Sequence, residues 1–153
     1  MRRGQAMIES MLAVVFTTFV LLFSIYIVRM LTAKILLDHA AARAARAKAV
    51  GFNDFMCHKA AQTAPIPVAG KSLVDLSGGS ELHRIPLYLA SESPARARAV
   101  LDYEWWSGAS LDIDEERGLA PSIDAHTRLE TDSFAVEGAA SIESHYPLYM
   151  DEF

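Results

Sequence analysis

Cysteine is almost absent from this chain of 153 residues, in which Cys57 stands alone. A single cysteine excludes an internal disulfide framework and a cysteine-rich zinc site. It does not settle the redox compartment, because a secreted domain with a helical stem can fold without disulfides. The histidines are scattered, and no second ligand lies at a suitable spacing from Cys57 and His58. We therefore expect no metal and no other cofactor, and we interpret Cys57 as a small buried residue where a stem meets a head.

Basic residues are scarce in the C-terminal part of the chain. Residues 60–153 carry six Lys or Arg against sixteen Asp or Glu, whereas residues 1–59 carry eight basic residues and three acidic ones. The formal net charge of −5 thus joins a basic stem to an acidic head. Phosphate backbones are bound by clusters of Lys and Arg, so the acidic head argues against a nucleic-acid partner.

Recognisable catalytic arrangements are missing too. No Ser/His/Asp, Cys/His or paired-carboxylate set has supporting context, and Gly78-Gly79-Ser80 lacks the Gly-Lys-Ser/Thr of a phosphate loop. The acidic run Asp112–Glu116 with Gly118 lacks the full twelve-residue pattern of a calcium loop. It favours a solvated acidic turn, with calcium binding left open. We predict that the protein is not an enzyme.

Formal charge is absent from Ser10 to Val28. At about 1.5 Å per residue, a helix over this run is roughly 28 Å long, which is enough to cross the hydrocarbon core of a bilayer. The run is apolar on every side, and its hydroxyl groups can bond back to the helix backbone. We predict a transmembrane helix over residues 5–33.

Two alternatives to a transmembrane helix are less favoured. A buried helix of a soluble protein is disfavoured by the length of the apolar run. A cleaved secretory signal would have a shorter apolar region followed by a small-residue cleavage site, whereas Arg29 and a strongly helical stretch follow here. Charge alone leaves the orientation open, because Arg2 and Arg3 precede the run and several Lys and Arg follow it.

Glu9 stands at the start of the apolar run, behind the short basic leader Arg2-Arg3-Gly4. A carboxylate in this place is costly in lipid unless it is paired or lies at headgroup depth. One interpretation is a residue at headgroup depth that the helix N-terminus favours. The other depends on the whole segment Arg3-Gly4-Gln5-Ala6-Met7-Ile8-Glu9.

This segment resembles the class III signal of type IV prepilins, and most closely that of the TadE-like minor pilins of tight-adherence systems. Those proteins often begin Arg-Gly-x-Ala-x-Val-Glu, and Ile8 replaces the Val here. Met7 departs mildly from the pattern, as does Ser10, where an aromatic residue is common. The resemblance covers roughly residues 2–50 and does not extend to the head.

The resemblance implies that a membrane prepilin peptidase cuts between Gly4 and Gln5 on the cytoplasmic side, so that residues 1–4 are a leader. Glu9 is then the fifth residue of the mature chain. The implied partners are the peptidase, the lipid of a bacterial inner membrane, and other pilin-like subunits that contact the N-terminal helix. The implied topology is a single pass with the N-terminus in the cytoplasm and the head in the periplasm, followed by incorporation into a surface pilus.

The chemistry of these residues agrees with that interpretation. Glycine has no side chain, so Gly4 leaves the scissile peptide accessible at the membrane surface. The cut would free an amino group that the Glu9 carboxylate of a neighbouring subunit could pair with. Each charge is costly alone in an apolar bundle, so such pairing would set the axial register of the subunits.

Proline and glycine are absent from Gln5 to Val50. Alanine and straight-chain residues dominate the second half of this stretch and are the best helix formers, so we predict one helix of about 45 residues, roughly 70 Å long. Gly51 should cap or bend it, and Asn53 should cap a second helix over Asp54–Thr63. The stem thus covers residues 34–64. Its alanines give a thin surface for the head or for a neighbour: Ala40, Ala41, Ala44, Ala45 and Ala47.

The head, residues 65–153, begins with weak signals. Pro65-Ile-Pro67 predicts an extended segment, Lys71–Ser80 a loop, and Leu82–Leu89 a short strand. Ser93 with Pro94 predicts the start of a helix that runs over Ala95–Trp106.

Beyond Gly108 the apolar period changes to two, which predicts half-buried antiparallel strands. They begin with Leu111 and Ile113, continue over Ile123–Leu129, and end with a strand from Phe134 to Ile142 that reaches toward Tyr146. We expect a tight turn at Thr131–Ser133, a bulge at Gly138, and an edge or end of the last strand before Pro147. The predicted fold class is α+β: a long N-terminal transmembrane helix that continues into a periplasmic helical stem, then a small antiparallel sheet with a short helix.

These observations predict a non-enzymatic, pilin-like subunit of a bacterial type IV or tight-adherence pilus or a related secretion filament. The alternative is a single-span envelope protein whose head binds a partner or ligand without entering a filament. The sequence does not distinguish a major from a minor subunit, and it does not identify what the head contacts.

Overall fold

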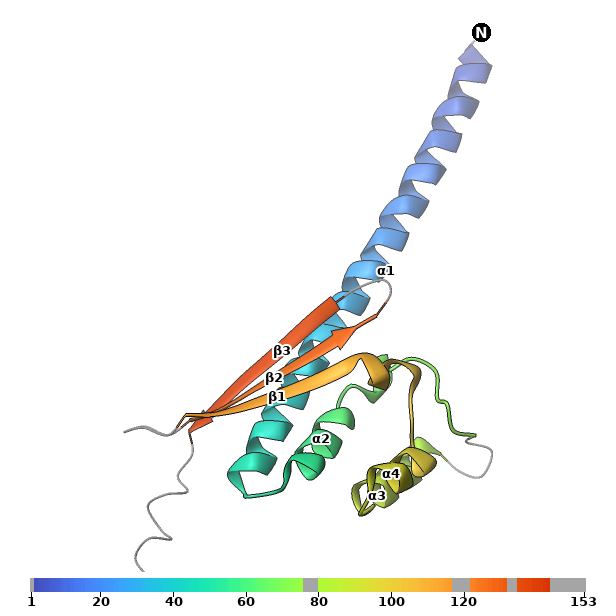
Figure 1. The fold of residues 1–153 in the computed structure, drawn as a ribbon. Coiled ribbons are helices and arrows are strands. Elements are labelled where there is room, and N and C mark those ends of the chain that lie inside the picture. Colours follow the sequence, from blue (N-terminus) through green and yellow to red (C-terminus); the bar gives the residue numbers. More distant parts are fainter. Residues whose placement is uncertain (1, 76–79, 117–121, 132–134, 144–153) are drawn as a thin grey trace, which may run out of the picture. The chain divides into compact units, whose positions relative to one another are not determined.

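The computed structural model describes residues 2–75, 80–116, 122–131 and 135–143 (Figure 1). The chain forms two compact units, Met1–Thr32 and Ala33–Phe153. Its elements are, in order, α1 (Arg2–Ala49), α2 (Asp54–Gln62), the 3₁₀ helix η1 (Ile66–Val68), α3 (Glu81–Leu89), α4 (Pro94–Val100), the 3₁₀ helix η2 (Glu104–Gly108), β1 (Ala109–Glu116), β2 (Ser122–Glu130) and β3 (Ala135–Glu143). The α+β class with a long apolar N-terminal helix is confirmed.

Helix α1 ends at a glycine cap, as the sequence predicted. Gly51 has φ of 93°, in the left-handed region that a side chain would disfavour. Its amide donates to the Lys48 carbonyl at 2.8 Å, and the Phe52 amide donates to the Ala47 carbonyl at 3.1 Å. These two bonds form a Schellman motif, which satisfies carbonyls that the end of a helix leaves open.

Two side-chain caps begin the next helices. The Asn53 side chain accepts from the Met56 amide at 2.9 Å and starts α2, which stops one residue before the predicted end. Ser93 accepts from the Arg96 amide at 3.4 Å and starts α4. The predicted helix to Trp106 is wrong, because the backbone becomes extended at the fully buried Leu101 and then forms the separate η2 turn.

Two further predictions for the head are wrong. Leu82–Leu89 belongs to the helix α3 although Pro86 lies inside it. Every third or fourth residue of α3 faces the interior, and Ile85, Tyr88 and Leu89 pack into an apolar cluster, so tertiary burial overrides the local signal against a helix. The Pro65-Ile-Pro67 segment is part of the 3₁₀ helix η1 and is not extended.

The sheet has the order β1-β2-β3, and both pairs are antiparallel. The predicted strands are confirmed, with β3 at an edge. The register is continuous through Gly138, which lies opposite Thr127, so the predicted bulge is absent from the described strand. The predicted turn at Thr131–Ser133 lies partly outside the described residues. Phe134, Tyr146 and Pro147 lie entirely outside them.

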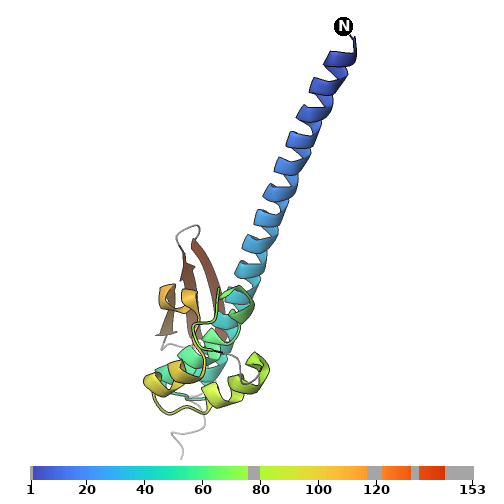
Figure 2. The same ribbon diagram turned by 90° about the vertical axis from the view of Figure 1, so that its right-hand side faces the viewer.

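The inner face of the sheet packs on the C-terminal part of α1. Figure 2 shows the strands along one side of this segment. Alanines on one face of the helix meet the apolar residues of the strands, so the helix and the sheet approach closely. The buried cluster consists of Ala40, Ala41, Ala44, Ala45, Ala61, Ala64, Ile123 and Ala125. Four of the five alanines predicted to form a stem surface are thus covered by the same chain, whereas Ala47 is half-buried outside the cluster.

A second apolar cluster lies among the short helices. It consists of Ala69, Tyr88, Ala97, Leu101, Tyr103 and Trp106. The Tyr103 and Trp106 rings lie edge to face with centroids 4.8 Å apart, a favoured aromatic geometry. Burial raises the pKa of both Tyr88 and Tyr103 to about 12. This cluster fixes α3 and α4 to the same unit as the sheet.

Candidate functional site

The proposed processing site lies in the first turns of α1. The backbone of Gly4 and Gln5 is helical, and Glu9 lies one to two turns further on with an exposed side chain. Ser10 donates its hydroxyl to the Met7 carbonyl at 2.9 Å and so adds no unpaired polar group. Gly4 and Glu9 are therefore separated along one helix by about 7.5 Å of axial rise.

The apolar span behind Glu9 has no tertiary cover in its own unit. The helix from Met7 contains a window of 18 residues with a mean hydropathy of 2.5, none of which is buried. Thr17, Thr18 and Ser24 each donate to the carbonyl four residues earlier, at 2.8–2.9 Å. These three hydroxyl groups thus have internal acceptors, and the helix is long and apolar enough to cross a membrane.

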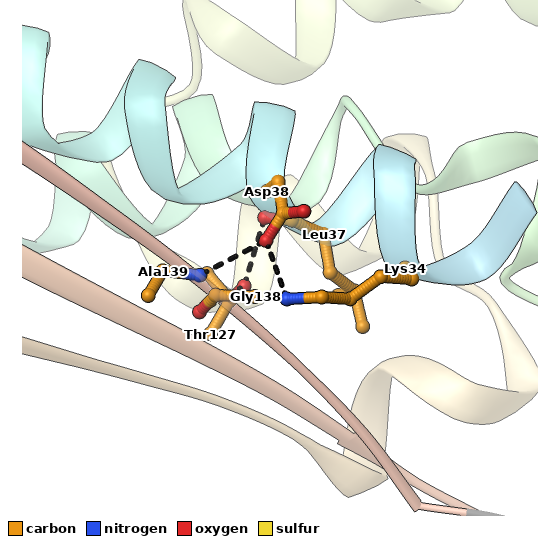
Figure 3. Close-up of polar contacts among 6 residues, drawn as sticks. All are labelled: Lys34, Leu37, Asp38, Thr127, Gly138 and Ala139. Carbon is orange, nitrogen blue, oxygen red and sulfur yellow. Dashed lines mark hydrogen bonds and ion pairs between the residues drawn. The ribbon is translucent and has the colours of Figure 1, made fainter. Parts of the chain in front are cut away.

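The two ends of α1 differ in the burial of their side chains. From Ala33 onward one face is buried, beginning with Ala33 and Leu37. On that face a polar joint ties α1 to the sheet (Figure 3). Thr127 donates its hydroxyl to the Leu37 carbonyl at 2.9 Å, and the Ala139 amide donates to the Asp38 carboxylate at 3.1 Å.

Lys34 completes this joint. Its ammonium donates to the Asp38 carboxylate at 2.8 Å, one helical turn away. The Lys34 hydrogen bond is the main reason that the pKa of Asp38 lies below its usual value, and the Ala139 amide adds to the shift. The joint therefore favours the charged form of Asp38, and both side chains remain half exposed.

Gly138 makes the joint possible. A Cβ atom on this residue would lie 2.4 Å from the Leu37 carbonyl carbon and 2.5 Å from the Asp38 amide nitrogen. The backbones of β3 and α1 therefore touch, and any side chain would force them apart. Sequence reasoning assigned the glycine to a bulge, because contacts between residues about 100 positions apart leave no local signal.

A second polar joint lies at the other end of the sheet. Lys48 donates to Asp54 at 2.9 Å and to Glu115 of β1 at 3.1 Å. The hydrogen bond that Lys48 donates to Asp54, followed by the one that it donates to Glu115, raises the pKa of Lys48. The last turn of α1 is thereby tied to the distal end of β1.

The buried Lys59 of α2 was not predicted as a functional or structural residue. It is 1% exposed, and its ammonium donates to the carbonyls of Leu89, at 2.8 Å, and of Ser91. It also lies 4.5 Å from the centroid of the Phe55 ring. Burial lowers its pKa. The ammonium satisfies carbonyls at the end of α3, so its role is to cap that helix from another element.

The remaining candidates from the sequence contribute no site. Cys57 is fully buried, as predicted, and burial raises the pKa of its thiol. Asp112–Glu116 lies in the strand β1, and Gly118 falls outside the described residues. Within the described ranges, no group of three His, Cys, Asp or Glu side chains could hold a metal ion.

No protein-family model, curated protein or solved structure matches this chain.

Proposed function

We propose that the protein is a non-enzymatic, pilin-like subunit of a bacterial filament, anchored in the inner membrane by α1 and processed after Gly4. The observation that carries the proposal is the order of features in one helix: a basic leader, Gly4, Glu9, and an apolar span without tertiary cover. The N-terminus lies in the cytoplasm and the head in the periplasm, because the prepilin peptidase acts on the cytoplasmic side.

The second half of α1 supports this function. The joints at Asp38 and Lys48 tie the helix to the sheet at both ends of their contact. The span supplies contacts to lipid and to other subunits, while the head remains folded on its own alanine-lined stem.

Glu9 has a defined role in this proposal. After cleavage, its carboxylate pairs with the Gln5 ammonium of an adjacent subunit. Both charges would be costly alone in an apolar bundle, so the pair selects the axial register in which they meet. A solitary membrane anchor has no such neighbour, and its Glu9 would lie at headgroup depth.

The test compares Glu9→Ala with wild type in cells that make the filament. The variant should still insert and be cleaved, because the span and Gly4 are unchanged. Its incorporation into sheared surface filaments should fall at least about tenfold, since the loss of one partner of a buried pair costs about 3–5 kcal/mol. Glu9→Gln is the matched control and should be milder, because the amide still accepts a hydrogen bond. Equal incorporation of wild type and Glu9→Ala would favour the single-span envelope protein.

A further inference from the structure

The segment of α1 in the second unit presents a basic face. We define this basic face as His39, Arg43 and Arg46, which recur at spacings of four and three residues and so share one side of the helix. The buried alanines occupy the opposite side. Arg46 is exposed and Arg43 half-buried. Neither arginine has an acidic partner within the described part of the chain.

The outer face of the sheet is acidic at its distal end. We define this acidic face as Asp112, Asp114, Glu116, Asp124 and Glu143, which alternate along the strands with the residues that pack on α1. Arg128 lies on the outer face, and its guanidinium forms ion pairs with Glu130 at 3.2 Å and Glu137 at 3.7 Å. No described Lys or Arg forms an ion pair with any carboxylate of the acidic face.

Within the acidic face, two carboxylates occupy directly opposed positions. Asp114 lies directly opposite Asp124 in the β1–β2 register. Like charges at directly opposed positions of an antiparallel pair destabilise a sheet. The fold thus keeps an unfavourable contact that a cationic surface would relieve.

The two faces lie at one level of the unit. Lys48 of α1 contacts Glu115, which stands between Asp114 and Glu116 in β1. Arg46 precedes Lys48 by two residues, or about 3 Å along the helix axis. The basic face and the acidic end of the sheet therefore lie at the same level along the axis of α1 but on opposite sides of the unit. The two faces cannot meet within one chain.

We propose that the acidic face of one copy of this chain docks on the basic face of a second copy. The charges are complementary, and side-by-side copies bring the two faces together with little axial displacement. The faces are different surfaces, so the contact is heterologous and leaves one free face at each end of a row of copies. The inference goes beyond the proposed function, because every residue involved lies within 39–143 and none belongs to the processing site or the apolar span.

The experiment uses two full-length, differently tagged chains made together in a bacterial membrane. One carries Val50→Cys, an exposed position four residues after Arg46 on the same side of α1. The other carries Ser141→Cys, an exposed position opposite Asp124 on the outer face. A short bifunctional maleimide should join the two different chains far more than two like chains. The native Cys57 is fully buried, so chains without an added cysteine give the background.

Charge reversal then tests the chemistry of the contact. Arg43→Glu with Arg46→Glu in the first chain should lower the cross-linked fraction about tenfold, because several exposed attractions become repulsions. Asp114→Lys with Asp124→Lys in the second chain should restore it. Arg96→Glu with Arg98→Glu on α4, also exposed, is the matched control and should leave the fraction unchanged.

Several results would overturn the docking. Preferential joining of like chains would indicate a two-fold contact, and joining to a different protein would indicate another partner. A cross-linked fraction that does not respond to charge reversal would also contradict the docking, as would the absence of any cross-link. If no cross-link formed, calcium bound by the acidic face or lipid bound by the arginines would become the explanation for the two charged faces. The uncut Gly4→Leu chain should still cross-link, so failure of the docking and failure of the pilin proposal are distinguishable.

Discussion

The two halves of α1 follow different rules although they form one helix. In residues 7–32 nearly every apolar side chain is exposed, from Met7 at 64% to Leu31 at 58%. From Ala33 onward one face, which is mainly alanine, is buried, and the exposed residues include charged side chains as well as Ile35. A helix that is apolar on every side needs lipid or other subunits around it. An amphipathic helix instead buries its apolar face against the rest of its own chain. Side-chain burial thus changes within a single element, between Thr32 and Ala33.

The sharpest way to break the covered half is to fill the space at Gly138. Gly138→Val should destabilise the second unit by about 4 kcal/mol, because its side chain would have to displace the backbone of α1 at Leu37. Thermal melting of the detergent-solubilised chain, followed by near-ultraviolet circular dichroism of Trp105 and Trp106, measures the loss. Gly51→Ala is the control, since nothing lies within 4 Å and only its positive φ costs about 1 kcal/mol. Similar melting of both variants would refute the close approach.

A charge placed in each half sharpens the contrast. Leu21→Lys puts an ammonium in the middle of the apolar span and should oppose membrane insertion by about 3 kcal/mol. Val50→Lys, at an exposed position beyond the span, should insert like wild type. The fraction of each protein that resists alkaline extraction from membranes is the measurement. If both variants remained in the membrane equally, the first half would not require lipid.

The smallest expected effect concerns the polar joint. The pKa of Asp38 is lowered by Lys34, so the joint contributes stability above about pH 4 and loses it as the pH falls through the lowered pKa. Because both side chains are half exposed, we expect only a few tenths of a kcal/mol. Wild type should melt slightly above Asp38→Asn at pH 6, and the difference should shrink steadily as the pH falls below about 4. A difference that does not shrink with falling pH would show that Asp38 acts by packing and not by charge.

Local signals predicted the parts of the fold that depend on local chemistry. The uninterrupted helix from Gln5, the Gly51 cap and the Asn53 cap each follow from the residue and its immediate neighbours. The strands followed from the alternation of apolar and polar residues. Helix α3 did not follow from local signals, because Pro86 and the shortness of the segment disfavour a helix. It is stabilised by the burial of Tyr88 and by Lys59 of α2, which caps carbonyls at its end.

The joints could not be predicted for the same reason. Asp38 and Ala139 are separated by 101 residues, and no sequence pattern near either residue indicates their contact. The opposite holds for Gly4 and Glu9, whose meaning depends on a short contiguous motif and an apolar run. The processing hypothesis is thus readable from the sequence, whereas the anchoring of the sheet on α1 required the structure.

The N-terminal residue of the mature protein tests the central claim most directly. The full-length gene product should be purified from membranes of cells with an active prepilin peptidase and sequenced from its N-terminus, with Gly4→Leu as the uncut control. The account predicts that the wild-type chain begins at Gln5 and that the Gly4→Leu chain keeps its leader. A wild-type chain that begins at Met1, or one cut after residue 28, would contradict it.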